Sequence, residues 1–508
     1  MNKIKILLII IIVLASSLRL VGVTHENLCQ IELHHTFRIV NSNIKESFNV
    51  DIHPPLYYVL MHFWVKIFGF SDFSLRYPSV IFGILSVVVT FMLARELFNQ
   101  KIALLSSYFV GMSEFVIFNS KEARHYSMLL FLATLSTYYF VKFLKSKRSN
   151  TFLYILVSVL AIYTHYYFIF VIVLQNLLFV LFYDRNKLFS WIKTQALILL
   201  LFIPQLIRFV QQAMFISSNS WYGNSIPIRE LTFMFESFNN QTGNLGLIIF
   251  GFFFLVGLFD LIKHNKNKRI IVKKSSFIML IMFVGPLLLS IITSLTLFNT
   301  FGLARFFIYI IPPYYIIISK GILKIKNKNL LTIILIIITL LLGQSVYTQW
   351  TTNYKTEWKE AAHFLEENTN NSDVIIITDW DSMKELILRY YKGNADITSI
   401  KMKSEQQSID WGGDINLFLD KDYIKSLIEE ELTNKNKTIW FVYVNDKQYT
   451  PGEDIIKNML EDEYLFKKGQ QVFESCKKGN ARNGNYCQPI IIYKYEKDKN
   501  NEKPKTQT

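Results

Sequence analysis

Residues 151–183 read TFLYILVSVLAIYTHYYFIFVIVLQNLLFVLFY, an apolar stretch without a carboxylate, lysine or arginine. As one α-helix it would extend about 50 Å, whereas the hydrocarbon core of a bilayer is about 30 Å thick. Basic residues flank both ends, and such residues concentrate on the cytoplasmic side of a membrane. The segment is therefore predicted to cross the membrane twice, as two short helices that turn at Thr164-His165-Tyr166.

Further apolar runs approach the roughly 20 residues that a membrane-spanning helix requires. They are residues 4–23, 77–97, 102–118, 126–143, 189–209, 247–262, 276–298, 306–319 and 330–347. Together with the divided segment they predict eleven crossings. The run 56–70 is short and contains Lys66, so it is predicted to lie at the outer interface, where it leaves the alternation of sides intact.

The distribution of charge supports this topology. The net charge is +15, but the residues after Trp350 hold 23 basic and 27 acidic side chains, so the whole basic excess lies before them. It falls in short loops between apolar runs, as the positive-inside bias requires, and this placement argues against nucleic-acid binding. With a cytoplasmic amino terminus, eleven crossings place everything after Tyr347 on the extracytoplasmic side of the cell membrane.

The composition excludes a soluble multidomain protein, a disordered chain and a disulfide-rich secreted scaffold. Of 508 residues 51% are apolar and 18% charged, the mean hydropathy is +0.26, and there are three cysteines. The predicted fold class is an α-helical polytopic membrane protein with about 11 transmembrane helices and a C-terminal extracytoplasmic α/β domain. The predicted divisions are a membrane domain 1–350 with a first outer loop 24–75, an α/β domain 351–496 and a charged tail 497–508.

Helical and strand patterns alternate in the α/β domain. Helices are predicted at 358–367, 382–391 and 423–431, strands at 374–378 and 438–444, and further short elements at 454–459 and 490–495. Cys476 and Cys487 enclose ten residues rich in Gly, Asn and Lys and are predicted to form a disulfide.

At the other end of the chain, residues 4–23 are predicted to be an uncleaved anchor, although they also resemble a signal peptide.

Polar side chains gather in the loops that this topology places outside. Each has an ordinary explanation, such as a surface ion pair between Glu122 and Arg124, but their convergence on one side favours a site. They are Glu26, Glu32, His34, His35, Glu46, Asp51 and His53 in the first outer loop, Lys121, Glu122, Arg124, His125 and Tyr126 in the next, then His165, and finally Arg305.

Several of these residues lie in motifs that resemble one enzyme family. The motifs are His53-Pro54-Pro55-Leu56-Tyr57-Tyr58, Lys121-Glu122-Ala123-Arg124-His125-Tyr126, Tyr163-Thr164-His165-Tyr166-Tyr167, Arg305 followed by Pro312-Pro313, and Glu357-Trp358-Lys359-Glu360-Ala361-Ala362. In this order they resemble the polyprenyl-phosphate-sugar-dependent glycosyltransferases of the GT-C fold, which include the protein O-mannosyltransferases and the aminoarabinose-transferase-like enzymes. The resemblance covers roughly the first 380 residues.

The resemblance implies transfer of a hexose, such as mannose, from a polyprenyl-phosphate donor in the membrane to an acceptor protein, lipid or glycan. A carboxylate would take the proton of the attacking hydroxyl, with inversion, and cations would stabilise the leaving phosphate. No cofactor and no bound metal are predicted, because no histidine spacing is diagnostic, and a divalent metal remains only as an alternative. The assigned residues are Glu32, Asp51 and Glu26 as catalytic carboxylates, Arg124, Arg305, Lys121 and His53 for the donor phosphate, and Glu122, His165, Tyr57 and Tyr126 for substrate positioning.

One position departs from the family pattern. Family members carry an Asp-Glu pair about twenty residues before His-Pro-Pro, and here Ile31 stands where the aspartate would be, followed by Glu32. Three interpretations stay open. Glu32 acts as the base after a small local shift, Glu26 or Asp51 replaces it, or the chain is catalytically silent.

A transporter or lipid flippase is the principal alternative function, followed by a silent scaffold whose outer domain binds a partner. Transporters place ionisable groups near the midplane of the membrane, often in repeated halves. The ionisable groups inside the apolar runs here, such as Glu114 and Arg208, lie near the ends of those runs, and no internal repeat is visible. This pattern favours the glycosyltransferase.

Overall fold

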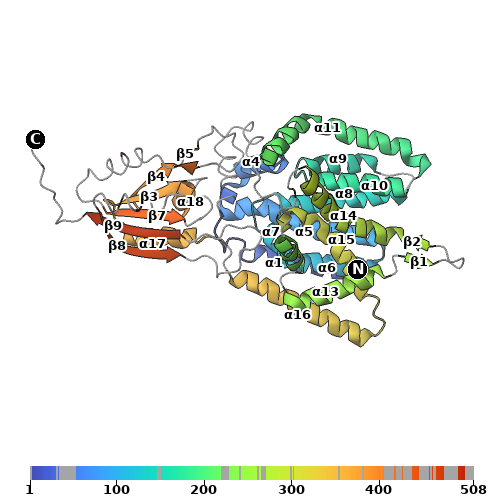
Figure 1. Ribbon diagram of the computed structural model, residues 1–508. Coiled ribbons are helices and arrows are strands. Elements are labelled where there is room, and N and C mark those ends of the chain that lie inside the picture. The colour runs from blue at the N-terminus through green and yellow to red at the C-terminus, as the bar shows by residue number, and fades with distance from the viewer. Residues whose placement is uncertain are drawn as a thin grey trace, which may run out of the picture. The chain divides into compact units, whose positions relative to one another are not determined.

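The computed structural model contains two compact units, which are described here one at a time (Figure 1). Unit 1 comprises Met1–Val23 and Arg38–Thr352, and unit 2 comprises Thr24–Phe37 and Asn353–Thr508. The structure describes residues 3–29, 32–33, 53–145, 150–182, 184–218, 228–239, 242–259, 262–264, 270–297, 303–352, 355–379, 383–401, 403–404, 417–418, 438–444, 465–473 and 490–497, with the single positions 300, 426, 457 and 460.

Unit 1 is almost entirely helical. Its helices are α1 (Lys3–Leu20), α4 (Leu56–Phe68), α5 (Asp72–Leu97), α6 (Gln100–Met112), α7 (Glu114–Ser120), α8 (Tyr126–Lys145), α9 (Thr151–Ile162), α10 (Phe168–Leu181), α11 (Arg185–Ser218), α12 (Ile228–Phe238), α13 (Gly243–Leu258), α14 (Lys274–Thr296), the 3-10 helix η1 (Ala304–Ile310), α15 (Ile311–Ile322) and α16 (Lys328–Thr351). A short hairpin, β1 (Ile262–His264) and β2 (Ile270–Val272), joins α13 to α14. Each predicted apolar run contains a helix, whereas α12 and the hairpin were not predicted.

The apolar segment 151–183 is broken where the sequence predicts. Helix α9 ends at Ile162 and α10 begins at Phe168, and the connecting turn is closed by a hydrogen bond from the backbone N–H of His165 to the carbonyl of Ala161 (3.1 Å). At 1.5 Å per residue these helices are only about 18 and 21 Å long, less than the thickness of a hydrocarbon core. The turn therefore sets His165 between two short apolar helices.

Several helices have the length and composition of membrane spans. Among the described residues, five qualify, in α5, α8, α11, α14 and α16, and up to seven if two bent pairs count as single spans. One of these pairs, α6 with α7, is bent by 58°. Helix α11 exposes large apolar side chains such as Leu199 and Leu200, as expected of a surface that faces lipid. The chain is therefore a multi-pass membrane protein, whereas eleven crossings and the sidedness of the termini stay predictions.

Helices α13 and α15 approach closely at two glycines. A Cβ on Gly257 would lie 2.1 Å from the carbonyl oxygen of Ile317, and a Cβ on Gly321 would lie 2.0 Å from that of Phe253. Both separations are too short for any side chain, so each glycine packs directly against the backbone of the other helix. Small residues have this role at helix interfaces in membranes.

Replacement of Gly321 by alanine is expected to force α13 and α15 apart. Overpacking of this kind costs about 1–3 kcal/mol, which a lowered thermal unfolding midpoint of the detergent-purified protein would reveal. Gly251→Ala is the matched control, because Gly251 lies on α13 with open space around its Cβ position. Equal midpoints for the two variants would contradict the close contact.

Unit 2 is built on a five-stranded sheet with the order β4-β3-β7-β9-β8. Its elements are α17 (Trp358–Asn368), β3 (Val374–Asp379), α18 (Met383–Tyr390), β4 (Asp396–Lys401), β7 (Ile439–Val444), β8 (Leu465–Phe473) and β9 (Ile490–Lys497), with a small pair β5 (Lys403–Ser404) and β6 (Leu417–Phe418). Strand β3 is parallel to β4 and β7, whereas β9 is antiparallel to β7 and β8. The sequence patterns did not predict β4 and β8. Outside the described residues lie most of the predicted helix 423–431, most of the element 454–459, and the Cys476–Cys487 disulfide.

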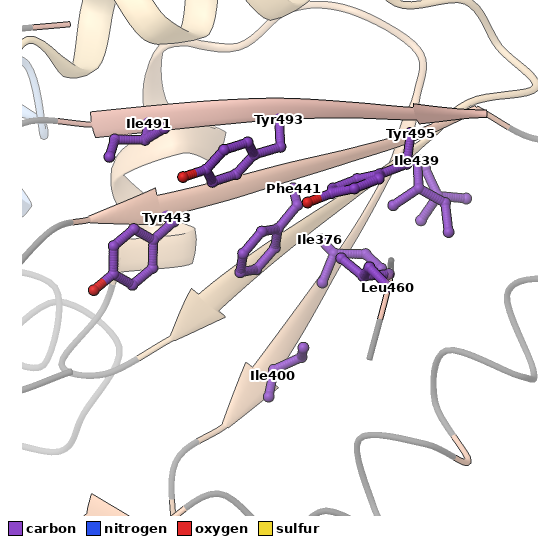
Figure 2. Close-up of a cluster of buried hydrophobic side chains, with 10 residues drawn as sticks. Ile376, Ile400, Ile439, Phe441, Tyr443, Leu460, Ile491, Tyr493 and Tyr495 are labelled. Carbon is purple, nitrogen blue, oxygen red and sulfur yellow. The ribbon is translucent and has the colours of Figure 1, made fainter. Parts of the chain in front are cut away.

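The central strands of this sheet are buried on both faces. Ile439, Phe441 and Tyr443 alternate along β7 and join one apolar cluster, in which Phe441 stacks on Tyr493 at 6.2 Å (Figure 2). The intervening Trp440 lies on the opposite face, where its ring contacts Phe364 of α17 at 6.0 Å. Burial on both faces explains why these strands have continuous apolar sequences without alternation.

The start of the first outer loop belongs to unit 2. The side chain of Asn27 donates to the carbonyl of Thr356 and to the carboxylate of Glu360, both at 3.1 Å, and the backbone N–H of Leu28 donates to the hydroxyl of Tyr390 at 3.1 Å. The sequence analysis grouped the whole of loop 24–75 with the membrane domain. Division of the structure into compact units instead groups residues 24–37 with unit 2, and the hydrogen bonds of Asn27 and Leu28, which no sequence pattern reveals, agree with that grouping.

Candidate functional site

Three histidines from three separate turns of unit 1 form one cluster. The ring centroids of His53 and His125 are 4.3 Å apart, those of His53 and His165 5.1 Å, and those of His125 and His165 5.0 Å. His125 and His165 are buried, and His53 is half-buried. One potential ligand nitrogen from each ring lies within 4.8 Å of the other two.

The backbone fixes each histidine at the end of a helix. His53 precedes Pro54 and Pro55, and Pro55 is the N-cap residue of α4. The N–H of Leu56 donates to the carbonyl of Tyr163 (3.0 Å) in the turn that carries His165. This bond joins the start of α4 to the break between α9 and α10. His125 precedes α8, and its carbonyl accepts the first helical hydrogen bond, from Leu129 (2.9 Å).

Two arginines from distant parts of unit 1 meet at the ring of Tyr126. The guanidinium carbon of Arg124 lies 5.2 Å from the ring centre, and that of Arg305, on η1, lies 5.3 Å from it. All three side chains are buried. The Tyr126 ring also lies 4.4 Å from that of His125, so the arginines and the histidine cluster share one region. Buried guanidinium groups provide paired, charge-assisted donors for a phosphate.

A chain of hydroxyl groups holds Arg124 in place. The hydroxyl of Ser79 donates to the carbonyl of Arg124 (2.9 Å), and because serine has only one hydroxyl proton, the Tyr57 hydroxyl must donate to the Ser79 oxygen (2.9 Å). Tyr57 therefore connects α4 to the turn that carries Arg124. The contribution of Tyr57 to substrate positioning stays a prediction, and this connection is the contact through which it is tested below.

Replacing Tyr57 by phenylalanine is expected to weaken the support of Arg124. One buried hydrogen bond is worth about 1 kcal/mol, which corresponds to roughly a fivefold loss of phosphate affinity with the helical fold kept. Titration of the purified protein with a polyprenyl phosphate would measure this loss. Tyr108→Phe is the control, since the Tyr108 hydroxyl bonds to Thr339 on an exposed part of α16. An effect of equal size in the control would contradict the assignment.

Glu122 and Lys121 take different positions. Glu122 is buried on the same turn as Arg124, whose backbone N–H donates to the Glu122 carbonyl (2.8 Å). The ammonium of Lys121 donates to the carbonyl of Val21 (2.8 Å) and lies 5.6 Å from the ring of Trp350. These contacts join Lys121 to residues at the ends of α1 and α16, and its phosphate-binding role stays a prediction.

The predicted catalytic carboxylates belong to the first outer loop. Glu32 is fully buried in unit 2, where it forms an ion pair with Lys355 (2.7 Å) and accepts a hydrogen bond from the N–H of Cys29 (2.9 Å). Glu26 is half-buried in the same unit. Asp51 and Ile31 lie outside the described residues. Glu32 thus has a structural partner that the sequence analysis did not foresee.

Comparison with known proteins bears on the origin of this site. Residues 52–207 match the model of the dolichyl-phosphate-mannose-protein mannosyltransferase family. The predicted resemblance is confirmed. The mannosyltransferase-family segment runs from α4 into α11 and includes the three histidines and Arg124, whereas Arg305 lies beyond it. An uncharacterized protein of Aquifex aeolicus (strain VF5) is 32% identical over 113 residues, which span 22% of this chain and 23% of that protein.

The fold extends the similarity beyond the mannosyltransferase-family segment. ArnT from Cupriavidus metallidurans in its apo state aligns with a TM-score of 0.58 at 10% identity, over 96% of this chain and 97% of that one. The same enzyme bound to undecaprenyl phosphate aligns over the same shares with a TM-score of 0.50 at 10% identity. At this identity the likeness concerns the fold alone.

Sequence reasoning missed two contributors to this region of unit 1 and one residue of unit 2. In unit 1, His125 was noted without an assigned role and Ser79 was given none; in unit 2, Lys355 was given none. The adjacency of His125 to Arg124 was a usable signal for the first. Ser79 and Lys355 act through hydrogen bonds to distant parts of the chain, and no local pattern indicates them.

Proposed function

We propose that this protein is a membrane glycosyltransferase that moves a hexose from a polyprenyl-phosphate donor to an acceptor hydroxyl on the extracytoplasmic face. The observation that carries the proposal is the meeting of Arg124 and Arg305 at Tyr126, inside the helical unit that contains the family segment. Similarity to the fold of ArnT, which has been crystallised with undecaprenyl phosphate, supports a lipid phosphate as the donor's carrier.

The chemistry suits the residues of unit 1. A polyprenyl phosphate is a good leaving group, so catalysis requires stabilisation of the phosphate charge more than a strong general acid. Arg124 and Arg305 supply that stabilisation, and their burial in a medium of low dielectric strengthens it. Glu122 and His165 position the substrates from the same region. A carboxylate of the first outer loop takes the acceptor proton as the hydroxyl attacks the anomeric carbon, which gives inversion.

A reconstituted transfer assay tests the proposal. The purified chain in liposomes receives radiolabelled polyprenyl-phosphate hexoses, mannose first, together with membranes of the host as a source of acceptors. Release of free polyprenyl phosphate and appearance of label in protein, lipid or glycan supports the proposal. Label that crosses the bilayer with its bond to phosphate intact identifies a flippase instead. Absence of both with every hexose identifies a silent scaffold.

A further inference from the structure

We infer that His53, His125 and His165 form a binding site for a divalent transition metal, and that zinc is its natural occupant. Within the described residues these three side chains come from three turns that are far apart in the sequence, and each offers one imidazole nitrogen within 4.8 Å of the others. The metal site itself requires only this geometry. Its role toward the donor phosphate rests on the proposed function.

The spacing of the rings suits a shared ion. Zinc binds imidazole nitrogen at 2.0–2.1 Å, so three nitrogens at tetrahedral positions lie about 3.4 Å apart. The three nitrogens here lie within 4.8 Å of one another, so small rotations of the side chains bring them to the separation that a zinc ion requires. The ring centroids, at 4.3, 5.1 and 5.0 Å, already surround one point, and the rings are tilted at 42–53° rather than stacked face to face.

The surrounding structure limits how far the histidines can separate. The bond from Leu56 N–H to the Tyr163 carbonyl fixes the His53 turn against the His165 turn, and the bond from Ser79 to the Arg124 carbonyl fixes the residue next to His125. Ligands held on rigid helix ends lose little entropy when they bind an ion. Preorganisation of this kind distinguishes a built site from three histidines that merely share a surface.

Among the contacts of the described residues, a hydrogen bond of His165 must change when the ion binds. The backbone N–H of Tyr167 donates to Nδ1 of His165 at 3.1 Å, which places the ring proton on Nε2. Coordination through Nδ1 replaces this donor with the metal, and coordination through Nε2 requires the other tautomer. Either route gives up one hydrogen bond, a small loss beside three metal–nitrogen bonds.

The ligand set selects the type of ion. Neutral imidazoles favour zinc, copper and nickel, whereas magnesium, calcium and manganese prefer carboxylate, carbonyl and water oxygens. Three protein ligands also leave a fourth tetrahedral position, as catalytic zinc sites do. Next to Arg124 and Arg305, a phosphate oxygen of the donor is suited to that position, where the ion would add its charge to that of the guanidinium groups.

Direct measurement of metal uptake tests the inference without any donor or acceptor. Chelator-stripped full-length protein in detergent is equilibrated with zinc or with magnesium, desalted and analysed by mass spectrometry for bound metal. The expected result is one zinc per chain and no retained magnesium. His53→Ala, His125→Ala and His165→Ala are each expected to lower zinc affinity at least 100-fold. His125→Cys keeps a zinc ligand and is expected to retain binding.

Two other histidines provide matched controls. His62 is buried on α4, and His363 lies on α17 of unit 2, so alanine at either position is expected to leave uptake unchanged. Wild-type protein that retains no zinc, or uptake that survives all three cluster substitutions, overturns the inference. Retained zinc without any sugar transfer contradicts the proposed function alone. If metal-free protein transfers sugar and the histidine substitutions abolish that transfer, the histidines bind phosphate directly and the metal site is overturned.

Discussion

An Arg305→Ala variant is expected to transfer sugar about 10²–10³-fold more slowly than the wild type. The loss is that of one preorganised donor at a group that gains negative charge in the transition state. Arg305 is 4% exposed and, like Arg124, lies over the ring of Tyr126. Water therefore has little access to this position and does not take over the role of the guanidinium group when it is removed. Turnover of a radiolabelled polyprenyl-phosphate hexose, measured at saturating donor, separates this effect from weaker donor binding.

The geometry of the guanidinium group also matters in this prediction. Arg305→Lys keeps the charge but loses the paired donors, so its rate is expected to fall between those of the wild type and Arg305→Ala. Arg95→Ala is the matched control, because Arg95 also lies over an aromatic ring, that of Phe91 at 5.6 Å, but at the far end of α5. Arg95→Ala should stay within about twofold of the wild type. Unimpaired transfer by Arg305→Ala would exclude a phosphate role for this residue.

Glu32→Gln is expected to destabilise unit 2 by about 3–5 kcal/mol. The substitution leaves the ammonium of Lys355, which is 3% exposed, without its carboxylate partner at 2.7 Å, and an unbalanced buried charge has a cost of that size. Thermal unfolding and limited proteolysis of the purified protein would measure the loss. A Glu26→Gln variant is the control, because Glu26 is only half-buried in the same unit.

A double substitution separates structure from catalysis at this pair. Glu32→Gln with Lys355→Met removes both charges, so stability is expected to return to within about 1 kcal/mol of the wild type. Transfer is expected to return with it, because the ion pair gives Glu32 a structural task. In that case Glu26 or Asp51 is the base. A double variant that is stable but inactive would identify Glu32 as the base, and an unstable one would contradict the energetic argument.

The sequence predicted the elements whose cause is local. Apolar runs predicted most helices of unit 1, and the polar turn around His165 predicted the break between α9 and α10. Both signals can be recognised without tertiary contacts, because they depend only on the length of an apolar run and on its turn residues. Strands β4 and β8 were missed since their sequences, such as Leu465–Phe473, are too polar for the pattern of a buried strand. Strand β8 lies at the edge of the sheet, where such a sequence is tolerated.

The candidate site was predictable in its residue types but not in its partners. The motifs identified Arg124, His53 and Arg305, and the structure brings these three side chains into one region of unit 1. The ion pair of Glu32 with Lys355 and the support of Arg124 by Ser79 join positions distant in the chain. Such pairings depend on the completed fold, and a single sequence contains no periodicity that reports them.

Unit 2 consists of two segments that are far apart in the sequence, and this has a consequence for biosynthesis. Its segment Thr24–Phe37 leaves the ribosome roughly 300 residues before Asn353–Thr508, with which it packs. Translation at about 5–20 residues per second makes that segment wait on the order of 15–60 s, while the intervening helices insert into the bilayer. During this interval the carboxylate of Glu32 lacks its ion-pair partner, because Lys355 has not yet been synthesised. Chaperone capture of the nascent chain should therefore concentrate on this early stretch and end once Lys355 has been synthesised and can pair with Glu32.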